Sequence, residues 1–136
     1  MTNRTWTLAF STALALLATT WGLQTALAQA PGFKRVELQK HDLSTPNHEA
    51  LVARGEFQPG AVVPKHTHPG EEIGFVLEGE IVVEIEGKPA QTVKAGETFF
   101  IAAGAVHTAK NASKAAAAVL STYVVEKGKP LVTPVK

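Results

Sequence analysis

Residues 60–79 read GAVVPKHTHPGEEIGFVLEG, and residues 96–111 read GETFFIAAGAVHTAKN. In the first stretch, His66 and His68 are two positions apart. Both imidazoles therefore point to the same side of an extended strand, while Thr67 points to the other. Pro69-Gly70 then turns the chain into a second apolar run. The stretch predicts two short strands, the first carrying two potential metal ligands on one face.

Four side chains of these stretches are candidate metal ligands. Glu72 follows the turn and can bring its carboxylate to the two histidines of the preceding strand. A third histidine, His107, arrives from a distant strand. Three neutral imidazoles and one carboxylate suit one divalent transition metal ion, with Zn, Cu, Mn, Fe and Ni all possible, and leave coordination positions for water or substrate. The expected ligand set is His66, His68, Glu72 and His107.

The spacing closely resembles the two paired motifs of the cupin superfamily. Here the motifs are G-x5-H-x-H-x3-E-x6-G from Gly60 and G-x7-G-x2-H-x3-N from Gly96. The resemblance covers residues 49–125 and implies an all-β fold, a single-domain cupin β-barrel (a double-stranded β-helix of jelly-roll type). One position departs from the family pattern. The second motif usually has proline two residues before Gly104, and Ala102 here changes the loop's stiffness without touching a candidate ligand.

Two alternatives to this metal site stay open. A two-residue shift of register at Pro69-Gly70 would make Glu71 the ligand in place of Glu72, although strand alternation points Glu71 the opposite way. The site could also be vestigial in a barrel that binds no metal. The presence of all four ligand types together argues against the second alternative.

Short β-type runs broken by glycine and proline fill the chain after residue 48. Regularly spaced runs of this kind indicate an all-β sandwich or barrel, and no helical stretch of useful length is visible in the same region. The runs are residues 50–57, 62–66, 73–77, 81–85, 91–93, 98–101, 106–110 and 115–125.

The first 28 residues have the pattern of a secretory signal peptide. Arg4 supplies a positive charge, residues 8–23 are mostly apolar, and Ala26-Leu27-Ala28 is a small-x-small cleavage site. An uncleaved amphipathic anchor is the alternative. The expected organisation is a signal peptide at 1–28, a lead-in at 29–48, the barrel at 49–126 and a C-terminal tail at 127–136. The mature protein is then periplasmic or secreted, with no membrane partner.

Composition argues against a polyanionic partner. The chain has 13 Lys and Arg against 12 Asp and Glu, so removal of Arg4 with the signal leaves 12 of each. A formal charge of zero gives no support for binding to nucleic acid or to anionic membranes. The chain has no cysteine, so an exported domain must be stabilised by its core and its metal.

The run at 73–77 is expected to be buried on both faces. Gly74 lies on the same face as Glu72 and should leave open space beside the ion. The opposite face is strongly apolar and must meet a second sheet or another subunit. A homodimer is the expectation, which the resemblance to cupins supports. The apolar residues of that face are Ile73, Phe75 and Leu77.

Other side chains receive ordinary structural roles. Tyr123 lies in the last run, where core packing is favoured over lining the cavity mouth. Asn111 is expected to bond to the backbone of a turn. His41 and His48 lie in the polar lead-in and should be exposed. The remaining aromatic residues are expected in the core: Phe57, Phe99 and Phe100.

The resemblance leaves function open between three classes. The first is a metal-dependent enzyme, such as a dioxygenase, isomerase or lyase, acting on a small oxygenated or carbonyl-containing molecule. The second is a non-catalytic metal or small-ligand binding protein, and the third is a structural domain with an incidental metal. A shared fold does not choose among them. Catalytic residues beyond the metal ligands are unknown. Zn or Cu is the favoured metal, because the general affinity order places Cu and Zn above Mn and Fe and is not overridden outside the cytosol.

Overall fold

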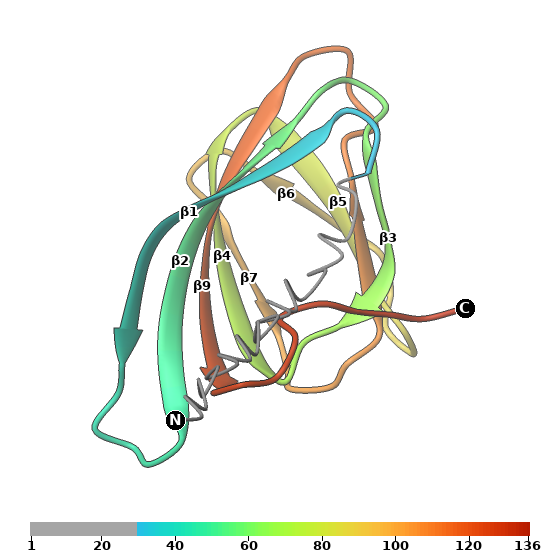
Figure 1. Cartoon of the computed structure of the whole chain (residues 1–136). Helices are drawn as coiled ribbons and strands as arrows, with labels where there is room; N and C mark the ends of the chain where they lie inside the picture. The colour runs from blue at the N-terminus through green and yellow to red at the C-terminus, as the bar shows by residue number, and fades with distance from the viewer. Residues whose placement is uncertain (1–29) are drawn as a thin grey trace, which may run out of the picture.

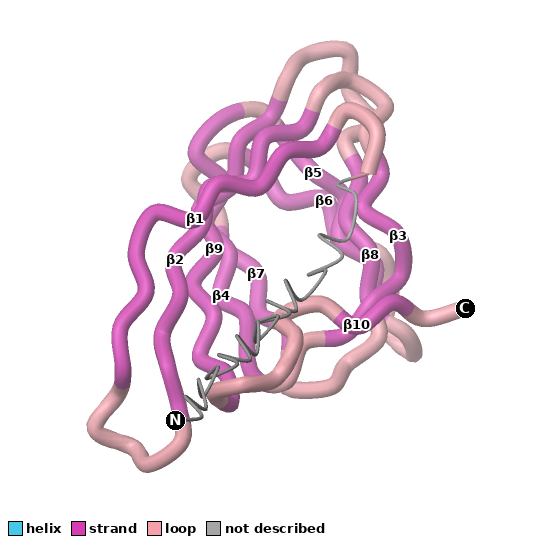
Figure 2. The backbone as a smooth tube through the Cα atoms, viewed as in Figure 1, coloured by secondary structure: helices cyan, strands magenta, loops and turns pink. Residues whose placement is uncertain are grey.

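The computed structural model describes residues 30–136, so the expected signal peptide lies outside the described residues. Within this range the chain is built from strands and turns, and no helix is long and apolar enough to span a membrane (Figure 2). The strands are β1 (Phe33–Asp42), β2 (His48–Phe57), β3 (Val62–Thr67), β4 (Gly70–Glu78), β5 (Glu80–Ile85), β6 (Gln91–Lys94), β7 (Thr98–Ile101), β8 (His107–Lys110), β9 (Ala117–Glu126) and β10 (Thr133–Pro134).

Two antiparallel sheets of five strands face each other (Figure 1). One sheet has the order β1-β2-β9-β4-β7 and the other has the order β10-β3-β8-β5-β6. Consecutive strands repeatedly cross from one sheet to the other, which is the connectivity of a jelly roll. The all-β barrel expected from the sequence is confirmed, and strands β2 to β9 match the eight runs expected.

Two strands of the structure, β1 and β10, were not expected from the sequence. β1 lies in the segment read as a lead-in and pairs with β2 along almost its whole length. β10 lies in the segment read as a tail and pairs with β3, with Pro134 opposite His66. Both strands are largely exposed, so their sequences mix polar and apolar residues and do not show the pattern of a buried strand. The division into lead-in, barrel and tail itself stays a prediction.

The core lies between the two sheets. Buried and less buried residues alternate along β2, β4 and β9, as period-two strands with one inward face require. The inward apolar residues form a main cluster that includes Val76, Ile81, Val83, Val93 and Ile101. Both sheets contribute to this cluster, so the barrel interior is held by contacts between them.

Two motif glycines are required by local backbone geometry. Gly79 has a φ of 70°, and a Cβ there would lie 2.6 Å from the carbonyl oxygen of Ala116. Gly104 also has a φ of 70°, and its amide donates a 3.0 Å hydrogen bond to the carbonyl oxygen of His68. A side chain at either position would be strained in the left-handed region. The Gly104 bond ties the second motif to the first.

Candidate metal centre

Three histidines converge inside the barrel from separate parts of the chain. His66 on β3 lies directly opposite His107 on β8, and their ring centroids are 4.2 Å apart. His68 follows the end of β3, with its ring centroid 4.8 Å from that of His66. All three are buried. One ring nitrogen from each lies within 4.8 Å of the others, a grouping that could hold a metal ion.

Backbone carbonyls determine which ring nitrogen each histidine presents. The Nδ1 atoms of His66, His68 and His107 lie 2.7, 2.6 and 2.9 Å from the carbonyl oxygens of Pro64, Leu131 and Ala105. A carbonyl oxygen only accepts hydrogen bonds, so each Nδ1 carries the proton and donates it. In a neutral imidazole the Nε2 atom then holds a lone pair. The three Nε2 lone pairs are thus available to a cation.

The Nε2 atom of His107 is the strongest sign of a missing partner. It is buried and has no hydrogen-bond partner in the structure. A buried polar atom without a partner costs free energy, on the order of 1–3 kcal/mol. A metal ion between the histidines would supply that partner, so the residues present fit a metal.

Glu72 brings a carboxylate from the opposite sheet to the same place. Its Oε2 atom lies 3.1 Å from Nε2 of His68 and 3.6 Å from Nε2 of His107. Two ligands about 2.1 Å from one ion are roughly 3.0–3.4 Å apart in octahedral or tetrahedral geometry, which is close to these separations. Its Oε1 atom accepts a 2.7 Å hydrogen bond from Ser121 Oγ. Glu71, the fallback ligand, is exposed on the other face of β4 and does not join this group.

Burial and neighbouring charge shift the protonation of this group. Burial lowers the pKa of His66 to about 4, and the nearby His107 and His68 add to the effect. Burial alone would raise the pKa of Glu72, but the imidazoles of His107 and His68 beside its carboxylate hold that pKa well below its usual range. His66 is therefore neutral and Glu72 is ionised at neutral pH, which are the states that ligate a metal.

Tyr123 lies beside the histidines and is both packed and cavity-lining. Its ring makes an edge contact with His68 at a centroid separation of 4.9 Å, and it is only 6% exposed. Burial, and then the charge of Glu72, raise the pKa of its phenol far above the ordinary value. The phenol is therefore neutral at physiological pH. Tyr123 therefore both packs in the core, as expected, and lines the cavity.

A cavity of about 230 Å³ opens onto the histidine group. His66, His107 and Glu72 form part of its wall, together with Ser121. The rest of the wall is mostly apolar and includes Phe57, Val63, Ile81, Val83, Phe99 and Val119. Cavities that take drug-sized ligands are roughly 300–1,000 Å³, so this cavity suits a small molecule.

Two expectations about aromatic residues and space are wrong. Gly74 does not leave open space beside the ion, because the ring of Phe99 fills that position, 2.0 Å from where a Cβ would stand. Gly74 therefore makes room for an aromatic ring. Phe100 is not a core residue, since it is 53% exposed on the outer face of β7. The other two phenylalanines, Phe57 and Phe99, are in the core as expected.

Asn111 has the backbone-bonding role expected from the sequence. Asn111 is 1% exposed and bonds to backbone, with Nδ2 donating to the carbonyl oxygens of Phe57 and Ala115. Its Oδ1 accepts from the amide of Ser113. His41, near the end of β1, is exposed as expected, whereas His48, at the start of β2, is half-buried; both lie away from the histidine group.

Sequence reasoning missed three parts of the site. Ser121 shares the inward face of β9 with Tyr123, so strand alternation could have identified it. Arg35 lines the cavity from β1, a strand that the sequence did not reveal. The carbonyl oxygen of Leu131 is a backbone group, for which no sequence signal exists.

Comparison with known proteins agrees with this geometry. The family model for the cupin domain matches residues 53–123, and a germin-like protein of Arabidopsis thaliana (subfamily 2 member 2) is 40% identical over 77 residues, covering 53% of this chain and 35% of that protein. The HTH-type transcriptional regulator PuuR of Escherichia coli is 33% identical over 93 residues, covering 68% and 50%.

A solved oxalate oxidase in complex with the substrate analogue glycolate superimposes with a TM-score of 0.63 at 30% identity, covering 79% of this chain and 57% of that one. The chain spans about a third of the germin-like protein and about half of the regulator. These relatives differ in what they do, whereas the family match extends over more than half of the chain. The chain therefore belongs to the cupin family.

Proposed function

We propose that this protein is an exported metal-dependent enzyme acting on a small oxygenated or carbonyl-containing molecule. The observation that carries the proposal is the buried, partnerless Nε2 atom of His107, which is grouped with the imidazoles of His66 and His68 beside a cavity that His66 and His107 line. Buried polar atoms without partners are rare in native proteins. A group of three such ligands beside a cavity favours a metal that is open to substrate.

The chain's own residues would prepare the site for that chemistry. His66, His68, Glu72 and His107 would hold one divalent transition metal ion, which would supply Lewis acidity or, if redox-active, dioxygen chemistry. The carbonyls that accept from each Nδ1 orient the imidazoles, and Ser121 orients Glu72. The apolar wall limits the water that can reach a bound substrate.

The likeness to oxalate oxidase supports a small oxygenated substrate. That relative was solved with glycolate, described as a substrate analogue. A cavity of about 230 Å³ accommodates molecules of that size. Because the chain covers only part of each relative, the reaction itself is not carried over.

A non-catalytic binding protein is the second candidate. The similarity to a transcriptional regulator, PuuR, favours it, because that relative is not named as an enzyme. The neutral, buried Tyr123 phenol is also a poor general base, since its pKa is raised far above neutral pH. Turnover of a small hydroxy or oxo acid by the metal-loaded protein would support the enzyme, whereas stoichiometric binding without product would support the binding protein.

Metal content tests the ligand assignment. Elemental analysis should show close to one transition-metal ion per chain in the purified protein, and none in His66→Ala/His68→Ala. The matched control is His41→Ala/His48→Ala, which removes two histidines outside the group and should keep the metal. Stoichiometric metal in the first double variant would exclude the proposed ligands.

Zn or Cu is the proposed native metal. The signal lacks a twin-arginine pair, since Arg4 stands alone, so the chain would cross the membrane unfolded and meet its metal outside the cytosol. There the general affinity order places Cu and Zn above Fe and Mn. Mainly Fe or Mn in protein recovered from its native compartment would contradict this choice and favour redox chemistry.

Export through cleavage after Ala28 is the proposed route to the periplasm or the medium. Sequencing of the mature N-terminus should then begin at Gln29. An intact Met1 terminus on membrane-bound protein would indicate an anchor instead.

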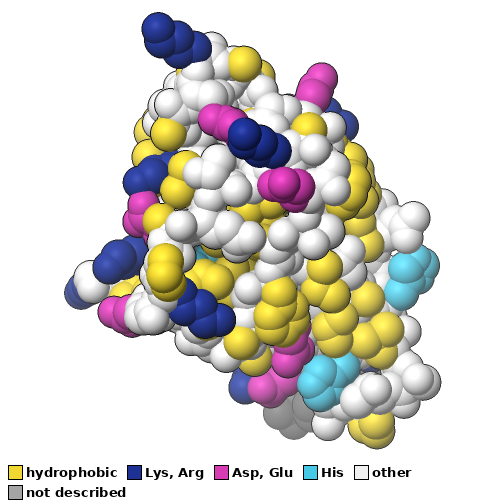
Figure 3. Space-filling view, turned by 180° about the vertical axis from the view of Figure 1, so that it is seen from behind, with side chains coloured by type: hydrophobic (Ala, Val, Ile, Leu, Met, Phe, Trp, Pro, Cys, Tyr) yellow, Lys and Arg dark blue, Asp and Glu magenta, His cyan; other side chains and the backbone are white. Residues whose placement is uncertain are grey.

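A homodimer through the outer face of β4 and β7 completes the proposal. Ile73, Phe75 and Phe100 are 48, 41 and 53% exposed, although they are large and apolar. No second sheet of residues 30–136 covers them, and Figure 3 shows hydrophobic side chains gathered on this side. Contiguous exposed apolar surface of this kind marks protein interfaces. A second copy fits a mature chain of zero net charge, which does not repel itself.

Light scattering measures this association. Wild-type protein should have the mass of two chains, and Phe75→Glu/Phe100→Glu should have the mass of one. Val62→Glu changes an exposed valine on the other sheet and serves as the control. A monomeric wild type would exclude the dimer.

A further inference from the structure

The cavity has a cationic side chain on one wall. Arg35 lines it from β1, on the same face as Phe33, and is half-buried. Burial is the main influence on the Tyr123 phenol and raises its pKa, but the positive charge of Arg35 opposes that shift. Arg35 and Tyr123 line the same cavity, and the ring of Tyr123 contacts His68. Arg35 and two of the three histidines, His66 and His107, therefore lie on the wall of one cavity.

Strand register provides the room for this long side chain. Arg35 is opposite Gly55 on β2, and the rings of Phe33 and Phe57 pack over that glycine. The next inward pair towards the histidines is Ala53 on β2 and Ser121 on β9. Directly paired and diagonal neighbours on one sheet face lie within reach of long side chains. The small side chains of Ala53 and Ser121 therefore leave room for an arginine to extend over the sheet on the side away from these rings.

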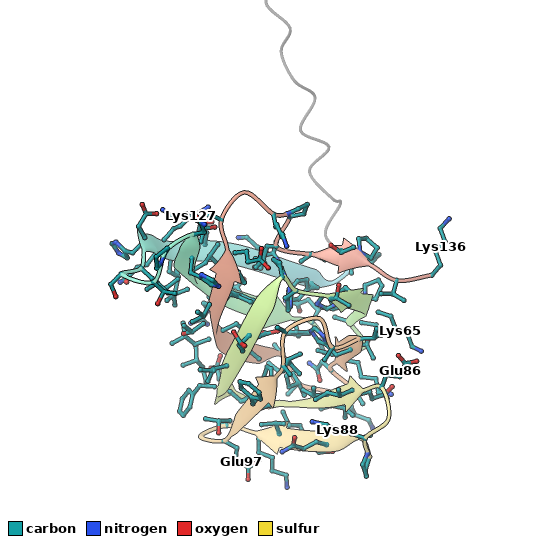
Figure 4. All side chains as sticks on the ribbon, turned by 90° about the horizontal axis from the view of Figure 1, so that it is seen from below. Lys65, Glu86, Lys88, Glu97, Lys127 and Lys136 are labelled. Carbon is teal, nitrogen blue, oxygen red and sulfur yellow. The ribbon has the colours of Figure 1, made fainter. Side chains whose placement is uncertain are left out.

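The other cation at the cavity wall does not compete for this role. Lys65 is exposed and points away from the barrel (Figure 4). The carboxylate that lines the cavity, Glu72, lies 3.1 Å from Nε2 of His68 and accepts a hydrogen bond from Ser121. Within the part of the chain that the structure describes, Arg35 is thus the inward-facing cation in a largely apolar chamber.

A guanidinium in such a chamber selects for one kind of ligand. It has five N–H donors in a planar fork, so a contact with one protein group leaves donors for a ligand. The fork matches a carboxylate with two parallel hydrogen bonds, and low polarity around it strengthens the attraction. An apolar wall favours a ligand whose remaining atoms are hydrocarbon.

We propose that the cavity takes a small apolar carboxylic acid in its anionic form, with the carboxylate bound by Arg35 and the hydrocarbon body against the apolar wall beside the histidine group. This inference rests on the proposed function only in assigning that anion as the substrate class. Arg35 is then the residue that distinguishes an acid from its neutral counterpart.

A matched pair of probes tests the inference. Benzoate and benzamide have nearly the same shape and differ in charge, and their dissociation constants can be measured by NMR titration of zinc-loaded protein. Wild type should prefer benzoate, and Arg35→Met should reduce the benzamide-to-benzoate ratio of dissociation constants about tenfold, the usual scale for a lost charged hydrogen bond. Any preference that a metal itself gives to the acid remains in the variant and cancels in this comparison.

Arg54 provides the matched control. It is the other arginine of residues 30–136, lies on the adjacent strand β2, and forms an ion pair with Glu56 at 3.3 Å, where both side chains are more than 40% exposed. Arg54→Met should leave the ratio unchanged. Absence of an acid preference in wild type, or an unchanged ratio in Arg35→Met, would overturn the inference.

Repeating the titration on metal-free protein separates this inference from the proposed function. The Arg35-dependent preference should persist without metal, and its disappearance there would also overturn the assignment. Elemental analysis of the same samples reports the metal site independently. If the protein binds no metal but still shows the Arg35-dependent preference for benzoate, the proposed metal enzyme is refuted and the proposed carboxylate site is supported.

Discussion

The Nδ1 atom of His68 donates a 2.6 Å hydrogen bond to the carbonyl oxygen of Leu131, 63 residues later in the chain. This bond sets the tautomer of His68 and aims its Nε2 atom at Glu72. β10 follows Leu131 and pairs with β3 at His66. The C-terminal segment is therefore attached to the histidine group at two places.

Removal of residues 128–136 should weaken metal binding about 10- to 100-fold, the range seen when a partner that orients a metal-ligating histidine is lost. Competition with a chromophoric chelator measures the affinity. Leu131→Ala is the control, because it removes the side chain and keeps the carbonyl. Wild-type affinity in a folded truncated protein would show that this bond does not position His68.

Ser121→Ala should disturb Glu72. The hydroxyl of Ser121 donates to Oε1 of Glu72 at 2.7 Å in a buried setting, so its loss leaves a buried carboxylate oxygen without that donor. We expect a loss of about 1–3 kcal/mol in unfolding free energy and a fall of about tenfold or more in metal affinity. Urea denaturation and chelator competition measure the two effects.

Ser121→Thr keeps the hydroxyl and should retain most of the affinity. Thr122→Ala, on the opposite face of β9, should change neither quantity. Equal behaviour of Ser121→Ala and Thr122→Ala would contradict the positioning role.

Gly74→Ala should destabilise the barrel by about 1–3 kcal/mol through overpacking. A Cβ at Gly74 would stand 2.0 Å from the ring of Phe99, which must then move into the cavity. The variant should also bind small cavity probes more weakly. Thermal denaturation and probe titration measure these effects, and Phe99→Leu added to Gly74→Ala should recover stability. Wild-type stability of Gly74→Ala would show that the Phe99 ring can move aside without a cost in unfolding free energy.

Acid should destabilise the metal-free protein in a defined pH range. The pKa of His66 is lowered from an ordinary 6.5 to about 4, so the unfolded chain binds the extra proton first as pH falls. The contribution of His66 to stability is then complete above pH 6.5 and is lost as pH falls from 6.5 towards 4. Urea midpoints of wild type and His66→Gln at several pH values isolate this effect, since other titrating groups are common to both. Parallel pH profiles would contradict it.

The spacing of His66, His68 and His107 predicted the three-histidine group, and the short β-type runs together with the resemblance to cupins predicted the fold. Short-range rules explain this success, because alternation along a strand puts His66 and His68 on one face and glycines set the turns. The same rules correctly turned Glu72 inward and Glu71 outward. Asn111 was predictable for a related reason, since a buried amide beside a turn bonds to the local backbone.

Tertiary structure alone decided what lies beside those histidines. The strand β1 is too mixed in polarity to be recognised in isolation, so the inward direction of Arg35 emerges only from its pairing with β2. Gly74 was read as open space because a sequence does not show that Phe99 from another strand fills it. The bond from His68 to Leu131 joins a side chain to a distant backbone carbonyl, and every residue has such a carbonyl. Local periodicity therefore determined which residues face inward. The pairing of distant strands and the position of the C-terminal segment determined which groups those residues contact.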